Sequence, residues 1–159
     1  MGVVAGREAF ARFRETLGPD ATIVFTNGCF DLLHAGHFRI LRYARSLGDL
    51  LVVGLNSDAS VRRLKGPDRP IVPQEARAAA LCGLESVDIV ILFDEQDPVE
   101  TIRAVRPSIH VKGGDYKPED MPETPVVEQY GGKVVIMPLV ADFSTSAYVE
   151  RARRANADE

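Results

Sequence analysis

Short apolar runs alternate with amphipathic segments along most of this chain. The runs are compact and rich in Val and Ile, and they predict buried strands at residues 22–26, 50–56, 89–93, 109–112 and 133–138. Apolar positions at helical spacing predict helices at residues 7–17, 37–47, 59–64, 73–85, 98–105, 126–130 and 145–153. Apolar strands separated by helices are typical of a parallel sheet covered on both faces. The pattern therefore predicts an α/β class, doubly wound sheet of about five parallel strands with helices on both faces.

The length and composition favour one ordinary globular domain. The chain has 159 residues, so we expect a single domain over residues 1–159, with residues 1–20 as an N-terminal helical extension. A net charge of −4 gives no reason to expect nucleic acid as a partner. We find neither a secretory leader nor a run of ~18 apolar residues, and we expect a cytoplasmic protein without a membrane partner. The two cysteines, Cys29 and Cys82, are expected as reduced thiols.

Ligands of such sheets bind beyond the carboxyl ends of the strands. Four polar loops are expected to gather at that edge, at residues 26–37, 56–58, 112–116 and 141–146. In the first of them, His34-Ala35-Gly36-His37 places two imidazoles at the junction between a predicted strand and the N-terminus of the next predicted helix. Free N–H groups and the helix dipole favour an anion there, and glycine lets the backbone approach it closely. The pair therefore predicts a phosphate site.

Two other interpretations of the histidine pair remain open at this point. Either histidine alone is more often a cap or a surface residue than a catalyst. Closely spaced histidines can also share a zinc ion. Zinc has weaker support, because His110 is distant in the sequence and neither Cys29 nor Cys82 belongs to a Cys-x-x-Cys pair.

The remaining loops contain residues that bind oxyanions. Lys65 and Arg69 lie in a Gly- and Pro-containing loop that is typical of a mobile lid, although solvated loop charges would look the same. Lys112 ends a strand before Gly113-Gly114, which indicates close approach of a ligand. The run Ser144-Thr145-Ser146 can cap the last helix and also donate to a phosphate. Asp31 is either a turn residue or a ligand for a substrate hydroxyl or a magnesium shell.

Several common enzyme classes have no motif in this chain. There is no Gly-x-x-x-x-Gly-Lys-Ser/Thr loop, no Gly-x-Gly-x-x-Gly after the first strand and no serine elbow. Phosphoryl or nucleotidyl transfer remains, because positioning and charge stabilisation supply most of its catalysis.

The segment Asn27-Gly28-Cys29-Phe30-Asp31-Leu32-Leu33-His34-Ala35-Gly36-His37 resembles the cytidylyltransferase-like nucleotidyltransferases, whose signature is Gly-x-Phe-Asp followed by His-x-Gly-His. The resemblance runs from about Thr22 to Val149. Further matches look most like the adenylyltransferase domains that make ADP-heptose from heptose 1-phosphate and ATP: Asn56-Ser57-Asp58, residues 62–66, Arg69-Pro70, Glu75-x-Arg77, Val111-Lys112-Gly113-Gly114-Asp115-Tyr116 and Ser144-Thr145-Ser146.

This resemblance implies a Rossmann-like fold and a specific reaction. A sugar phosphate oxygen attacks the α-phosphorus of ATP and pyrophosphate leaves, with Mg²⁺ as counter-ion. It implies catalytic roles for His34, His37 and Lys65. Nucleotide binding is implied for Thr26, Asn27, Gly28, Cys29, Phe30, Gly36, Lys112, Gly113, Ser144, Thr145 and Ser146. Sugar-phosphate binding is implied for Asp31, Asn56, Asp58, Arg69, Arg77, Gly114, Asp115 and Tyr116. No metal site made by protein ligands is expected.

The departures from the family pattern refine these expectations. Glycerol 3-phosphate relatives carry Arg-Thr where this chain has Leu139-Val140, which disfavours CTP. A CTP-dependent enzyme acting on a polyol phosphate or a phosphonate is the alternative, and a non-catalytic nucleotide-binding module is a second one. These relatives also carry Arg-Tyr-Val-Asp at their dimer interface, where this chain has Glu85-Ser86-Val87-Asp88. A homodimer with different contacts is therefore expected. Heptose enzymes often fuse this domain to a sugar kinase, so a separate kinase upstream is also expected here.

Overall fold

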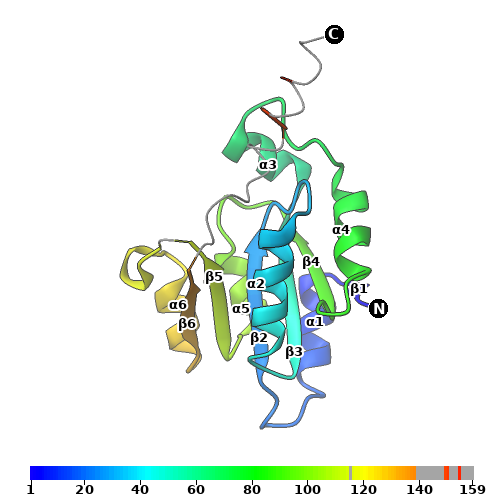
Figure 1. Cartoon of the computed structure of the whole chain (residues 1–159). Coiled ribbons are helices and arrows are strands. Elements are labelled where there is room, and N and C mark those ends of the chain that lie inside the picture. Colours follow the sequence, from blue (N-terminus) through cyan, green and yellow to red (C-terminus); the bar gives the residue numbers. More distant parts are fainter. Residues whose placement is uncertain (115, 139–148, 151–153, 155–159) are drawn as a thin grey trace.

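A parallel sheet forms the centre of the molecule in the computed structural model, which describes residues 1–114, 116–138, 149, 150 and 154 (Figure 1). Within these residues the sheet has six strands in the order β1-β4-β3-β2-β5-β6. They are β1 (Val3–Val4), β2 (Ile23–Gly28), β3 (Leu50–Asn56), β4 (Ile89–Phe93), β5 (Ile109–Gly113) and β6 (Lys133–Met137). The predicted α/β class and parallel sheet are confirmed.

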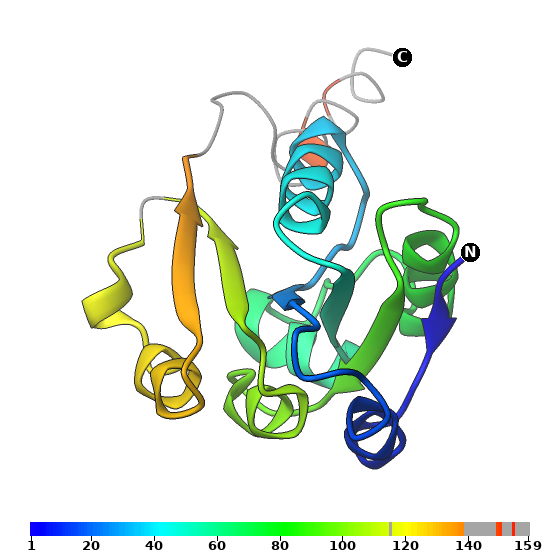
Figure 2. The same cartoon turned by 90° about the horizontal axis from the view of Figure 1, so that it is seen from below.

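Helices cover both faces of the sheet, as predicted (Figure 2). They are α1 (Arg7–Arg14), α2 (Ala35–Arg45), α3 (Asp58–Lys65), α4 (Gln74–Cys82), α5 (Val99–Val105) and α6 (Thr124–Gln129), with a 3₁₀ turn η1 (Pro118–Asp120). Figure 2 shows α2 and α4 on one face and α1, α5 and α6 on the other.

Successive residues of β2 pack into two different cores. Val24 belongs to the cluster that includes Leu41 of α2 and Leu81 of α4. Its neighbour Phe25 belongs to the opposite cluster, with Ile102 of α5. This alternation follows from the pleat of a strand, and each fully buried side chain of this kind contributes about 1.5–3 kcal/mol. The central strand is therefore held from both sides.

The element boundaries differ from the prediction in two informative places. The strand predicted at residues 22–26 extends to Gly28, because its polar end continues the ladder and pairs Asn27 with Gly54 and Gly28 with Leu55. The sixth strand, β1, was not predicted, since two exposed residues carry no readable period. The helix predicted at residues 145–153 lies largely outside the described residues.

The order of the strands creates a crevice beside β2. From β2 the chain runs to β3 and then β4 on one side, and afterwards returns to β5 on the other side of β2. At such a switch point the two connections leave the sheet in opposite directions, so the carboxyl ends of the neighbouring strands border an open space. Asn27, Gly28, Lys112 and Gly113 occupy those ends.

Candidate active site

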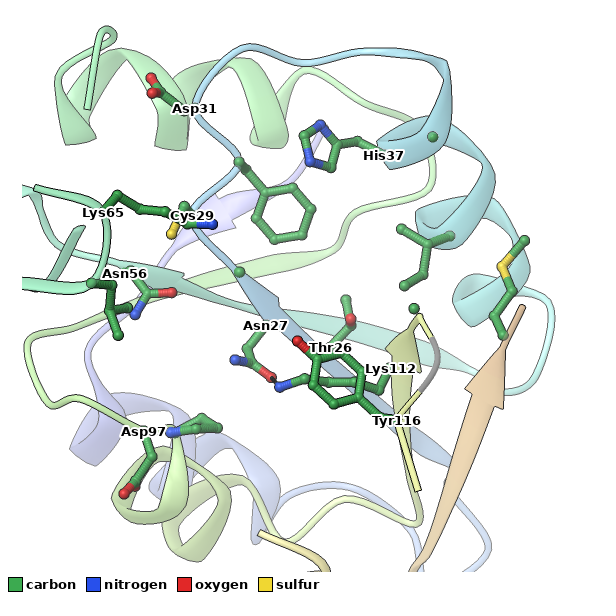
Figure 3. Close-up of a pocket in the computed structure, with 18 of the residues that line it drawn as sticks. Thr26, Asn27, Cys29, Asp31, His37, Asn56, Lys65, Asp97, Lys112 and Tyr116 are labelled. Atoms are coloured by element: carbon green, nitrogen blue, oxygen red, sulfur yellow. Dashed lines mark hydrogen bonds between the residues drawn. The ribbon is translucent and has the colours of Figure 1, made fainter. Parts of the chain in front are cut away.

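A pocket of about 650 Å³ opens at this crevice (Figure 3). Its size suits a nucleotide-sized ligand, because ligand sites in proteins typically enclose roughly 300–1,000 Å³. Most of the predicted site residues line it: Thr26, Asn27, Gly28, Cys29, Phe30, Asp31, His34, Gly36, His37, Asn56, Lys65, Arg69, Lys112, Gly113 and Tyr116. Four separate segments of the sequence are thus brought together at one edge of the sheet.

Other predicted site residues do not line the pocket. Asp58, Arg77 and Gly114 are not among its lining residues. Asp115 and the run Ser144-Thr145-Ser146 lie outside the described residues. Their predicted roles stay predictions.

The two histidines stack on each other at the start of α2. His34 is the N-cap residue of that helix, and its ring lies 3.8 Å from that of His37, centroid to centroid. Phe30 packs against His37, with the two ring centroids 5.1 Å apart. Phe30 has a positive φ of 44°, an unusual backbone conformation for a bulky residue, which is typically tolerated where function requires it. The loop thereby places the Phe30 ring against His37.

Burial keeps both imidazoles neutral at pH 7. It lowers the pKa of His37 to about 4, and the neighbouring His34 adds to this shift, while the main chain of Leu32 acts in the opposite direction. Burial also lowers the pKa of His34. A neutral imidazole has one N–H donor and one acceptor nitrogen. Each ring can therefore offer its single N–H to one acceptor, and in His37 the main chain of Leu32 competes with a phosphate oxygen for it.

Asp31 fastens the loop that follows α3. Its carboxylate accepts hydrogen bonds from Arg69 Nε at 2.7 Å and from the backbone N–H groups of Ile71 and Val72 at 2.9 Å. Burial alone would raise the pKa of Asp31, but these hydrogen bonds and the Arg69 charge lower it below its usual value. The geometry favours a positioning role, because Asp31 is buried and its oxygens already have partners.

Arg77 joins several segments below the pocket. Its guanidinium is 1% exposed and donates to the carbonyl groups of Cys29, Asn56 and Val72. It also pairs with Asp58 at 2.7 Å. These contacts tie the ends of β2 and β3 to the start of α3 and to the segment before α4, so Arg77 holds together segments that border the pocket.

A polar network lies at the ends of β2 and β5. Lys112 Nζ contacts Asn27 Oδ1 at 3.2 Å and the buried carboxylate of Glu123 at 2.9 Å. His110 Nε2 lies 3.2 Å from the same Asn27 oxygen. The ring of Tyr116, which is exposed, covers the Lys112 ammonium at 5.6 Å. Glu123 neutralises Lys112 in place, so this side of the pocket carries less free positive charge than the sequence indicates.

Sequence reasoning missed part of the pocket lining: Arg39, Ile40, Leu64, Gln96, Asp97, Pro98, Glu123, Met137 and Pro138. Helical spacing offered a signal for Arg39 and Ile40, since both follow Gly36 on the same side of α2. Nothing local marks Asp97 or Glu123, because no motif surrounds them.

Two negative findings concern the described residues alone. Among them, no three His, Cys, Asp or Glu side chains gather closely enough to hold a metal ion. No helix in the same part of the chain has the length and apolar character to cross a membrane.

Cys29 lines the pocket. Burial raises the pKa of its thiol, although the positive charges of Lys65 and Arg77 act in the opposite direction.

Comparisons with known proteins agree with this site. Residues 25–151 match the family model described as cytidylyltransferase-like. The bifunctional protein HldE of Syntrophotalea carbinolica is 56% identical over 130 residues, which are 82% of this chain and 26% of that protein. HldE of Trichlorobacter lovleyi is 53% identical over 137 residues, 86% of this chain and 28% of that protein. The chain thus spans about a quarter of the length of these relatives.

Two solved structures are also similar to this chain. A lipopolysaccharide core biosynthesis protein from Thermoplasma volcanium shares 32% identity with a TM-score of 0.61, over 77% of this chain and 99% of that one. A pantoate-beta-alanine ligase from Francisella tularensis, at 13% identity and a TM-score of 0.62, covers 89% of this chain and 69% of its own, and shows likeness of fold alone. The matched family model, the histidine pair and the pocket at the switch point lead to one conclusion: the chain belongs to the cytidylyltransferase-like family and is a nucleotidyltransferase.

Proposed function

We propose that the chain transfers the adenylyl group of ATP to a sugar 1-phosphate, D-glycero-β-D-manno-heptose 1-phosphate, and forms ADP-heptose. The observation that carries this proposal is the stacked pair His34 and His37, which faces Lys65 across a pocket at the switch point of the sheet. The identity with the HldE proteins over more than four fifths of the chain supports the choice of substrates.

The geometry suits an in-line displacement at phosphorus. An oxygen of the sugar phosphate forms a bond to the α-phosphorus of ATP, and the bond from that phosphorus to the bridging β-phosphate oxygen breaks, so that pyrophosphate leaves. No protein nucleophile is needed. The N–H groups of His34 and His37 would donate to non-bridging oxygens whose charge grows in the transition state. Lys65, at the exposed end of α3, would add positive charge beside the leaving group.

Mg²⁺ fits this pocket as an ion that arrives with the triphosphate. The carboxylates of Asp31 and Glu123 are occupied by Arg69 and Lys112, and Asp97 accepts from the backbone N–H of Val99. Mg²⁺ typically keeps several waters and binds substrate phosphates through few protein ligands. When bound, it would neutralise charge on the phosphates.

Pyrophosphate release from a matrix of substrates tests the proposal. ATP and CTP are each combined with heptose 1-phosphate, glycerol 3-phosphate and a phosphonate, with Mg²⁺ or with a chelator. We expect release with ATP and heptose 1-phosphate only, dependent on Mg²⁺. Pyrophosphate release with CTP and a polyol phosphate would instead support the alternative, a CTP-dependent cytidylyltransferase. Tight ATP binding without release in any combination would indicate a non-catalytic module.

We further propose that the chain acts as a homodimer in the cytoplasm and receives its sugar phosphate from a separate kinase. Sedimentation equilibrium tests the dimer, and a mass near 17.4 kDa would contradict it.

A further inference from the structure

Two hydrogen-bond donors converge on one atom at the floor of the pocket. Lys112 Nζ and His110 Nε2 each lie 3.2 Å from the same side-chain atom of Asn27. An ammonium group has donors and no acceptor, so the atom that faces Lys112 must be the oxygen of the amide. Lys112 therefore decides which way the amide of Asn27 is turned.

The tautomer of His110 follows from the same contact. Because Asn27 Oδ1 is an acceptor, the Nε2 atom of His110 must carry the hydrogen. His110 is completely buried and packs against Phe25, with ring centroids 5.4 Å apart. Burial, and after it the charge of Lys112, lowers the pKa of His110 to about 3, so the ring stays neutral with that single hydrogen in place.

The amide nitrogen of Asn27 is left for a ligand. In Figure 3 it points away from Lys112. Among the described residues no acceptor is paired with it, while Asn27 itself lines the pocket. Glu123 holds Lys112 against Asn27 Oδ1 through its own 2.9 Å contact, so the amide cannot turn over without breaking that arrangement.

We infer that Asn27 is a fixed hydrogen-bond donor to a substrate oxygen, oriented by Lys112 and by the buried positioning residue His110. This inference rests on the proposed function only in its choice of substrates. It gives Lys112 a different task from direct phosphate contact, because two of its hydrogens are directed at Asn27 and Glu123. An oxygen of ATP or of the sugar phosphate would complete the bond, since both substrates carry suitable acceptors.

A matched pair of variants at residue 110 tests the positioning role. His110→Gln keeps an N–H donor near the position of Nε2, whereas His110→Phe keeps the ring and removes the donor. We expect His110→Phe to raise the KM of one substrate about fivefold, the usual effect of one neutral hydrogen bond. His110→Gln should stay within about twofold of wild type. Measuring both KM values separately identifies which substrate carries the acceptor.

Variants of Asn27 test the direction of the amide. Asn27→Asp keeps an oxygen for Lys112 and His110 but has no N–H to offer. If Asn27 is a donor, Asn27→Asp and Asn27→Ala should both raise the KM of that substrate about ten- to a hundredfold. An Asn27→Asp variant with wild-type KM values would overturn the inference, as would identical kinetics for His110→Phe, His110→Gln and wild type. Thermal unfolding of each variant separates these effects from loss of the fold.

The outcomes remain distinct from failure of the proposed function. If wild type releases no pyrophosphate with any substrate pair, the proposed reaction is wrong, and calorimetric titration with ATP and with heptose 1-phosphate replaces KM in the same comparison. If wild type and all four variants then bind both substrates with equal affinity, the role of Asn27 is overturned independently of the reaction.

Discussion

At the scale of single residues, the proposed function requires His34 and His37 to act as uncharged donors. Their burial explains why, because the pKa of His37 falls to about 4 and that of His34 is also lowered. A donor aimed at charge that develops in the transition state affects the rate more than the binding of the ground state. The protonation state of these residues is thus part of the proposed mechanism.

Replacing His37 by alanine should lower kcat about 10²–10³-fold, with a much smaller change in the Kd of ATP. Single-turnover rates and calorimetric titration measure the two quantities. Arg42→Ala is a matched control on the same helix, since Arg42 does not line this pocket. An equal loss in kcat and in ATP affinity would mean that His37 only binds the ground state.

Residues joined by long-range contacts could not be identified from the sequence. His34 and His37 stand in a motif whose spacing and surroundings can be read directly, and the structure places both in the pocket. His110 meets Asn27 across 83 positions of the sequence. No local pattern announces such a contact, so the sequence indicated only that His110 is distant from the histidine pair.

Asp31 acts at the level of elements, because it connects the loop after β2 to the segment that leads into α4. The three donors on its carboxylate come from Arg69, Ile71 and Val72. This segment follows Lys65, so Asp31 limits how far the end of α3 can move from the histidines.

Asp31→Asn should loosen this segment and raise the KM of ATP more than it lowers kcat. Its cost in stability should be about 1–3 kcal/mol, because an amide cannot accept all three bonds equally well and Arg69 loses its charge partner. Hydrogen exchange of residues 69–72 measures the loosening directly. Asp68→Asn, an exposed change in the same loop, is the control. Unchanged exchange at Ile71 and Val72 would contradict the role of Asp31.

Arg77→Met should destabilise the fold by about 3–5 kcal/mol, because it leaves Asp58 and three carbonyl groups without their partner below the pocket. Urea unfolding measures this change. Arg103→Met removes an exposed pair with Glu100 and should cost less than about 1 kcal/mol. Similar losses for the two variants would show that Arg77 is not a structural centre.

The elements themselves were largely readable from the sequence. Buried strands such as β3 and β4 consist of apolar runs, and the structure confirms their predicted bounds. The polar end of β2 was harder to place, since Asn27 and Gly28 look like a loop but continue the ladder with β3. β1 has only two exposed residues, and its pairing with β4 depends on the finished sheet.

The stability of the whole molecule should depend on pH through the histidines whose pKa values are lowered by burial. The unfolded chain takes up protons on His37 and His110 below pH ~6.5, whereas the folded chain binds them only near their lowered pKa values of about 4 and about 3. Stability is therefore highest above pH ~6.5 and falls as the pH is lowered from there toward these values. Each histidine should contribute a loss of about 1.4 kcal/mol per pH unit in the lower part of that range.

Urea unfolding at pH 7, 6 and 5 measures this dependence. His110→Gln removes one titrating group. It should reduce the change in unfolding free energy between pH 6 and pH 5 by about 1.4 kcal/mol, which corresponds to one bound proton. The window lies above the ordinary pKa values of carboxyl groups, so acids such as Asp31 contribute little to it. An unchanged slope in His110→Gln would mean that His110 is protonated in the folded state.

The switch point at β2 also divides the two walls of the pocket along the sequence. The wall with the histidines, Lys65 and Arg69 is built before β4 begins, while the wall with Lys112, Tyr116 and Met137 is built after β4 ends. The two walls meet along a short ladder in which Val24 pairs with Ile109 and Phe25 with His110. A substitution in the later segment can therefore alter the second wall without changing any residue of the histidine loop.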